Sequence, residues 1–232
     1  MGSSKKQFLD LEGTPILIRT LRRIAACPEI TEIFVATPRE DVAAMRTLLS
    51  IESFGKPVTV VEGGNRRQDS VENCLRALSP QTELVAVHDA VRPFVPMELI
   101  AAVIEEASQT GAAILGILMV DTVKQVDRNR RITATIPRER LVLAQTPQVF
   151  RYDLLKRAFD KAREEDFVGT DEASLVEHLG AEVTVVRGSE RNIKITQPAD
   201  MELARFILEQ EQRAAGEATD TAGARSQPRS KG

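Results

Sequence analysis

The sequence has little of what several classes of protein depend on. Its 232 residues include only two cysteines, two histidines, one tyrosine and no tryptophan. Two cysteines are too few for a disulfide framework, and positions 27 and 74 lack the spacing of a metal site. Two histidines without further cysteines also argue against zinc. We expect Cys27 and Cys74, which lie in helical patterns, to be small buried thiols.

An excess of charge of one sign and a long apolar run are both missing. Lys and Arg number 31 against 34 Asp and Glu, so the net charge is −3. This balance gives no sign of binding to nucleic acid or a membrane surface. No apolar run approaches the roughly 18 residues of a membrane span, and the N-terminus does not resemble a signal peptide. We therefore expect a cytoplasmic enzyme or binding domain.

What the chain does contain is an alternation of short apolar segments with segments of helical periodicity. We predict strands over residues 31–37, 58–61, 85–87, 112–120, 141–144, 183–186 and 193–195. We predict helices over residues 14–25, 41–49, 68–78, 96–108, 152–164, 170–180 and 197 to about 210. This order indicates an α/β fold with a mostly parallel, Rossmann-like sheet, covered by helices on both faces and mixed at one edge.

Two segments stand apart from this alternation. Residues 121–126 and 131–136 alternate in polarity around the turn 127–130, and neither face of this hairpin is apolar enough for burial in its own subunit. We predict a protruding β-hairpin arm, about residues 121–140, that packs on a partner. Residues 211–232 have almost no apolar bulk and are expected to be a disordered tail. The remaining residues, 1–210, form one domain.

The strongest chemical signal is the stretch from Val85 to Pro93. A short apolar run, typical of a strand buried on both faces, breaks into His88-Asp89 and then Arg92. A carboxylate and a guanidinium at the carboxyl end of a buried strand lie where an open α/β sheet places its ligand. The structural alternative is a local ion pair between Asp89 and Arg92. Asp89 could hold Mg²⁺ or orient a hydroxyl, whereas His88 has no evident Ser or Cys partner and is expected to be structural.

Other candidate ligand residues also follow predicted strands. Gly63-Gly64 would let the backbone approach a base or ribose closely, or would simply form a turn, and Ser70 could donate to an oxygen. The candidates for binding an anion are Lys6, Arg92, Arg138 and Lys194, with Thr122, Thr146 and Thr170 as possible phosphate donors. The Walker A and GxGxxG fingerprints are absent. Together these residues indicate a site for a phosphate-rich ligand. The site has one acidic residue and no covalent nucleophile.

Eight motifs give the chain a family resemblance. Val87-His88-Asp89-Ala90-Val91-Arg92-Pro93 resembles the His-Asp-Ala-x-Arg-Pro motif of 2-C-methyl-D-erythritol 4-phosphate cytidylyltransferases. Further matches follow the family's order, at residues 6–9, 63–71, 121–124, 138, 145–148, 170–174 and 192–194. The resemblance spans nearly all of residues 1–210. Ribitol-5-phosphate cytidylyltransferases share most of these motifs.

The resemblance implies Mg²⁺-dependent transfer of a cytidylyl group from CTP to methylerythritol phosphate, with release of pyrophosphate, in non-mevalonate isoprenoid synthesis. Because the incoming phosphate is already an anion, cations and positioning would supply catalysis. The resemblance also implies a homodimer in which the arm of each subunit crosses to the other subunit. Ribitol 5-phosphate or another polyol phosphate is the alternative substrate. A nucleotide-binding remnant without activity is the alternative of another class.

The resemblance also implies a role for each matching residue. Catalysis would rest on Lys6, Arg138 and Lys194. The nucleotide would be held by Gly63, Gly64, Asn65, Ser70, Asp89 and Ala90. The pocket for the sugar phosphate would be lined by Asp89, Arg92, Thr122, Thr146 and Thr170, with Asp89 also near the metal. On the exchanged arm, Thr122 and Arg138 would serve the neighbouring subunit's site.

One departure from the family concerns the N-terminus. The family begins with a buried strand and a loop of the pattern Ala-Ala-Gly-x-Gly-x-Arg-Met, and Met1 here aligns with the end of that loop. The strand, the glycines and a catalytic arginine are not in this sequence. We expect a start site assigned too far downstream. A chain complete as written is expected to fold poorly and to have little activity, because backbone donors of such a loop bind phosphate.

Overall fold

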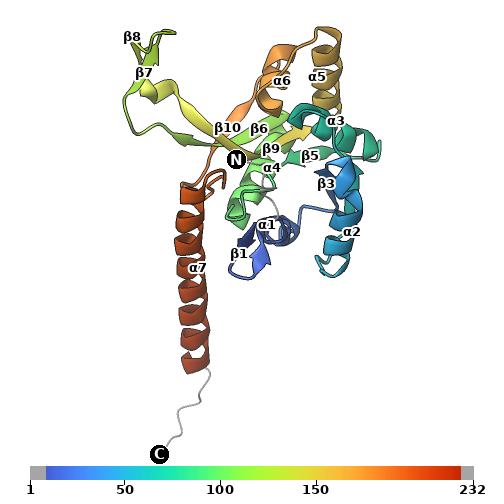
Figure 1. Ribbon diagram of the computed structural model, residues 1–232, viewed down its shortest axis with the longest axis vertical. Coiled ribbons are helices and arrows are strands. Elements are labelled where there is room, and N and C mark those ends of the chain that lie inside the picture. The colour runs from blue at the N-terminus through green and yellow to red at the C-terminus, as the bar shows by residue number, and fades with distance from the viewer. Residues whose placement is uncertain (1–8, 226–232) are drawn as a thin grey trace, which may run out of the picture.

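The computed structural model describes residues 9–225, without the side chains of residues 215, 216 and 218–225. Figure 1 shows a body of strands and helices from which two elements project, a hairpin and the long last helix. The strands are β1 (Asp10–Leu11), β2 (Thr14–Pro15), β3 (Ile33–Thr37), β4 (Val58–Glu62), β5 (Leu84–Val87), β6 (Ala112–Leu118), β7 (Val123–Val126), β8 (Ile132–Ile136), β9 (Val142–Arg151) and β10 (Thr184–Arg187). The helices are α1 (Ile16–Ala25), η2 (Arg39–Asp41), α2 (Val42–Ser50), α3 (Arg67–Ala77), α4 (Met97–Thr110), η3 (Arg138–Arg140), α5 (Tyr152–Glu164), α6 (Glu172–Leu179) and α7 (Pro198–Arg225).

The predicted α/β class is confirmed, and the central sheet is mixed. Its strand order is β10-β6-β9-β5, in which β10 runs parallel to β6 while β9 runs antiparallel to both β6 and β5. The mixing therefore lies inside the sheet and not at the edge where we expected it. The reason is the hairpin: the chain leaves the sheet through β6, turns in the arm and returns beside β6 as β9, so β9 must run in the opposite direction.

Helices cover both faces of this sheet, as the alternation of side chains along its strands requires. On β6, Ala113 and Leu115 pack into a core with α1, α2 and α4, whereas Ala112 and Ile114 face a second core with α5 and α6. A third cluster joins α7 to α1, β1 and the loop after β5. Strands buried on both faces explain the near-continuous apolar runs in the sequence.

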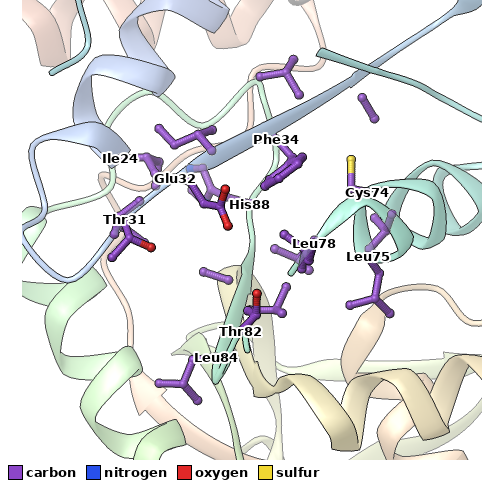
Figure 2. A pocket seen from close by; sticks show the side chains of 18 of the residues that line it. Ile24, Thr31, Glu32, Phe34, Cys74, Leu75, Leu78, Thr82, Leu84 and His88 are labelled. Carbon is purple, nitrogen blue, oxygen red and sulfur yellow. The ribbon is translucent and has the colours of Figure 1, made fainter. Parts of the chain in front are cut away.

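The parallel pair β3–β4 forms a separate sheet, and a cavity lies between β3 and β5. In the part of the chain that the structure describes, β3 pairs only with β4 and β5 pairs only with β9. The cavity has a volume of about 800 Å³ and is lined by residues 33–36 and 84–90, with α1 and α3 beside them. Figure 2 shows Phe34, Leu84 and Leu78 around it. One edge of each strand therefore borders an open, largely apolar slot.

The predicted arm is the antiparallel hairpin β7–β8, which projects from the body in Figure 1. Two predictions about the C-terminal part are wrong. Residues 193–195 form no strand in the described chain, and Ile195 is buried against α7 instead. The tail expected to be disordered from residue 211 is helical as far as Arg225. Alanines favour the helix there, and the next proline in the sequence is Pro228.

Both cysteines are free, as predicted. Cys27 is fully buried and Cys74 is half-buried, and burial raises the pKa of each thiol to about 11. Neither is a reactive thiol at neutral pH. In residues 9–225, no helix combines the length and the apolar character that a membrane crossing demands.

We predict that Phe150→Ala lowers the free energy of unfolding by about 3–5 kcal/mol. Phe150 is fully buried on β9 in the core with α5 and α6, so truncation leaves a cavity. Phe206→Ala is the matched control, because this side chain is 58% exposed on α7, and it should cost less than about 1 kcal/mol. Urea unfolding of both variants measures the difference, and equal losses would contradict this account of the core.

Candidate functional site

The end of β5 is built by a bulge in the neighbouring strand β9. The β6–β9 register moves from Ile114–Gln148 to Leu115–Gln145, which leaves Thr146 and Pro147 outside the ladder. Bulges re-aim side chains, and here the Thr146 hydroxyl accepts a hydrogen bond from the Asp89 amide at 3.0 Å. The strand end and the start of the His-Asp segment are thereby fixed.

His88 completes this support, as predicted for a structural residue. Its Nε2 lies 3.1 Å from the carbonyl of Arg92, and its Nδ1 lies 3.0 Å from the Thr146 hydroxyl. Since a carbonyl only accepts, Nε2 carries the proton, and Thr146 donates to Nδ1. Burial lowers the pKa of His88 to about 4, so the ring is neutral at pH 7. Thr146 is itself buried and has no hydroxyl proton left for a phosphate, so this geometry assigns it a supporting place.

Three cations surround the Asp89 carboxylate. Oδ2 accepts from Arg92 Nε at 3.1 Å and lies 3.0 Å from Lys194 Nζ, while Oδ1 lies 3.6 Å from Arg67 Nε. Arg92 is buried and also donates to the carbonyl of Asn192 at 2.7 Å. The local Asp89–Arg92 pair therefore exists, but it is one part of a larger cluster. Lys194, which comes from a distant loop, joins it as a half-exposed group.

The cations of the cluster keep its central carboxylate ionised. Burial opposes ionisation of Asp89, but Lys194, Arg67 and Arg92 outweigh it and lower the pKa of this carboxyl. Carboxylates offset part of the positive charge, because Glu172 pairs with Arg67 and Asp171 is also close enough to act on it. With its solvent-accessible Lys194, the site can bind a phosphate group.

A glycine turn between β4 and α3 contacts Ser70, which lines the same cavity. The Gly63 amide donates to the carbonyl of Thr37 at 2.8 Å, and the Gly64 amide donates to Ser70 Oγ at 3.0 Å. A Cβ at Gly63 would lie 2.9 Å from Ser70 Oγ, and one at Gly64 would overlap the Asp69 side chain. Close packing therefore requires a glycine at position 64 and disfavours a side chain at position 63. Ser70 and Ala90 both line the cavity, together with Asp89.

The remaining predicted residues are more scattered. Asn65 and Thr170 are exposed at the starts of α3 and α6. Arg138 and Thr122 lie at the base of the arm, where Arg138 donates to the carbonyl of Val120. Arg138 lines a second cavity of about 350 Å³, and none of the contacts found for the described residues joins it to Asp89. Lys6 lies outside the described residues.

Sequence reasoning missed several residues that hold the site together. Arg67, the first residue of α3, donates from Nη1 to Glu172 Oε1 at 2.7 Å. The buried amides of Gln145 and Asn192 brace the loop before Lys194, and that of Gln148 holds the first turn of α6. Each lies inside or beside a matching motif, but nothing in the local pattern distinguishes these side chains from solvent-exposed ones. Glu172 in particular had only the signature of an acid in a first helical turn.

Asp89 is also the residue to test for a divalent cation. Among residues 9–225, no group of three or more His, Cys, Asp or Glu side chains is placed to hold a metal. Asp89 stays ionised, and its Oδ1 has only the long contact to Arg67. One carboxylate oxygen fits Mg²⁺ only when phosphate oxygens and water complete the shell, which is the usual arrangement for Mg²⁺ with nucleotides.

We predict that acid weakens the fold through His88. The unfolded chain takes up a proton at this ring near pH 6.5, while the folded protein resists until about pH 4. The free energy of unfolding should therefore fall through this window, by up to about 3 kcal/mol. His88→Gln should show a shallower fall than the wild type. Denaturant unfolding at several pH values measures this, and equal slopes for the two proteins would contradict it.

Sequence comparison identifies relatives along almost the whole chain. Residues 1–210 match the IspD family, described as 2-C-methyl-D-erythritol 4-phosphate cytidylyltransferase. The enzyme of that name from Solibacter usitatus is 58% identical over 213 residues, covering 90% of this chain and 87% of the relative. The one from Acidobacterium capsulatum is 51% identical over 209 residues, covering 88% and 87%.

Solved structures agree with the sequence relatives. The 4-diphosphocytidyl-2C-methyl-D-erythritol synthase of Anaerococcus prevotii superposes with a TM-score of 0.80 at 32% identity, covering 86% of this chain and 88% of that one. The 2-C-methyl-D-erythritol 4-phosphate cytidylyltransferase of Thermus thermophilus gives 0.75 at 34% identity, covering 90% and 96%. With this fold, these motifs and relatives of this identity, the chain belongs to the 2-C-methyl-D-erythritol 4-phosphate cytidylyltransferase family.

Proposed function

We propose that this protein transfers a cytidylyl group from CTP to 2-C-methyl-D-erythritol 4-phosphate, giving 4-diphosphocytidyl-2-C-methyl-D-erythritol and pyrophosphate. The observation that carries the proposal is the Asp89 cluster, which joins one carboxylate to three cations beside the cavity. Relatives that bear this activity in their names cover about nine-tenths of the chain. The product belongs to non-mevalonate isoprenoid synthesis.

The reaction needs charge neutralisation and alignment of the substrates, and it does not need a nucleophile from the enzyme. An oxygen of the methylerythritol phosphate attacks the α-phosphorus of CTP, the new P–O bond forms, and the bond to pyrophosphate breaks. Both partners are anions, so cations must offset their repulsion in the transition state. Lys194 and Arg92 are the described cations that would face the phosphates, with Arg138 as a further candidate and Lys6 outside the described residues. This inventory supports a direct displacement.

The proposal extends to the residues that would hold each substrate. The turn of Gly63, Gly64 and Asn65 with Ser70 would contact cytosine and ribose, together with Ala90. Asp89 would hold Mg²⁺, which neutralises phosphate charge when bound. Thr122 and Thr170 would line the sugar-phosphate pocket. The support for these assignments is that Ser70, Asp89 and Ala90 border one cavity whose polar end carries the cation cluster.

We also propose a homodimer in which each arm reaches the partner's site. The arm and its base leave large apolar side chains exposed, which are Leu118, Val120, Val126, Ile132 and Leu143. Exposed apolar side chains on a projecting hairpin and at its base are suited to burial against a partner. A second copy of the chain would cover it and would bring Arg138 to a site that its own subunit does not reach. The cytoplasmic location expected from the sequence stays a prediction.

The substrate assignment is tested by pyrophosphate release with CTP and each polyol phosphate. We predict that methylerythritol phosphate gives the higher kcat/KM, by at least about tenfold over ribitol 5-phosphate, since each misfit at a bound hydroxyl costs about 1 kcal/mol or more. Comparable values would favour the broader polyol phosphate activity. CTP binding without pyrophosphate release from any polyol phosphate would instead support a nucleotide-binding protein without catalysis.

Mixed dimers test the exchanged arm. Arg138→Ala and Lys194→Ala should each lower kcat by about a hundredfold or more, because each removes a cation from the transition state. If Arg138 acts in the partner's site, a heterodimer of the two variants has one complete site, and an equal mixture should regain about a quarter of wild-type activity. Arg140→Ala is the control and should keep full activity. A mixture no more active than its components would rule out exchange.

A further inference from the structure

Glu172 presents a buried charge that the stability of the fold does not explain. Its side chain is 1% exposed at the start of α6, with Ala173, Leu175 and Val176 of the same helix in the apolar core. Oε1 accepts from Arg67, but Oε2 is buried without a hydrogen-bond partner among the residues that the structure describes. A buried carboxylate with one cation stabilises a fold little, and an apolar side chain of the same size often does better.

The placement of Glu172 is nevertheless well determined. Asp171 caps α6 by accepting from the Ser174 amide at 3.0 Å, and Gln148 accepts from the Ala173 amide at 3.0 Å. Gln148 also donates to Asp171 at 2.7 Å. These hydrogen bonds tie the first turn of α6 to the buried strand β9 on both sides of Glu172. Glu172 is thereby fixed, and it can hold the long side chain of Arg67 in place.

That partner, Arg67, is placed between two acids. Its Nη1 lies 2.7 Å from Glu172 Oε1, and its Nε lies 3.6 Å from Asp89 Oδ1. Its side chain is 39% exposed, so the contact with Asp89 alone would not hold it in one conformation. The buried end at Glu172 supplies the missing constraint. In this way α6 fixes a guanidinium that belongs to α3 against a carboxylate that follows β5.

From this geometry we infer that Glu172 is a positioning residue, which acts through Arg67 to set the orientation of the Asp89 carboxylate. With Oδ1 facing Arg67, Oδ2 is left for Arg92 and Lys194. Loss of the Glu172 charge releases Arg67, and Asp89 then loses one of its three fixed neighbours. The inference deepens the proposed function, since Asp89 borders the site of cytidylyl transfer.

The effect on catalysis should be a change in kcat more than in substrate binding. Glu172→Gln keeps the size and one acceptor of the side chain but removes its charge. Because small displacements of groups at the reacting centre are costly, we expect kcat to fall about tenfold while KM for CTP changes less than about threefold. Arg67→Gln should have the same effect, and Arg76→Gln is its control, an arginine of the same helix that pairs with Glu72.

Two comparisons separate positioning from a merely structural role. The melting temperature of Glu172→Gln should change little, because the charge left on Arg67 is partly exposed to solvent and is not stranded in the core. The double variant should be no slower than Arg67→Gln alone, since Glu172 acts only through that residue. Losses that multiply in the double variant, a kcat unchanged in Glu172→Gln, or a kcat that falls only in step with the melting temperature would overturn the inference.

A structural readout keeps the inference testable even if the proposed reaction is wrong. Crystal structures of the wild type and of Glu172→Gln without nucleotide should show Arg67 beside Asp89 in the first and displaced in the second. Arg67 unmoved in the variant would overturn the inference. A wild type that shows this arrangement but releases no pyrophosphate from CTP and methylerythritol phosphate would overturn the proposed reaction alone.

Discussion

The constraint on which this site depends is the cost of keeping one carboxylate ionised in a largely buried position. Asp89 has a side chain only 10% exposed, and burial alone would raise its pKa. It remains an anion because three cations converge on it from α3, from its own loop and from the loop before α7. Those cations, held at fixed distances by one acid, are also the groups that would bind phosphate in the proposed reaction. Asp89 therefore holds the three cations together and also offsets part of their charge.

The strand β9 carries most of the support for this arrangement. Its bulge sends the Thr146 hydroxyl to the end of β5, while Gln145 and Gln148 on either side brace the loop of Lys194 and the first turn of α6. The same strand is the returning leg of the arm, paired with β6 as far as Val142. Contacts made by the arm would therefore be transmitted to the site through one continuous strand. In a dimer of the kind proposed, assembly and catalysis would share this element.

The cavity beside the cluster has two chemically different ends. Near Asp89 it is bordered by Arg67 and Ser70, and along β3 and β5 it is bordered by apolar side chains such as Phe34 and Leu84 (Figure 2). An end lined by polar and positively charged groups suits phosphates. The apolar part lies along strand edges that have no strand partner in the described chain, so its chemistry is that of a sheet interior and not that of a ligand pocket.

The sequence by itself determined the α/β class, most strand positions, the glycine turn and the Asp89–Arg92 pair, because periodicity, turn residues and neighbours three positions apart are local properties. Only the tertiary structure decided that β9 runs antiparallel inside the sheet, that Thr146 supports a strand end, and that Lys194 and Arg67 meet at Asp89. The Arg67–Glu172 contact joins residues 105 positions apart. Such contacts follow from the order of the strands and the packing of helices on the sheet, which depend on residues far apart in the sequence. Residues 211–225 are a case in which a local property was misleading. Their low apolar content suggested disorder, but it is also compatible with an alanine-rich helix.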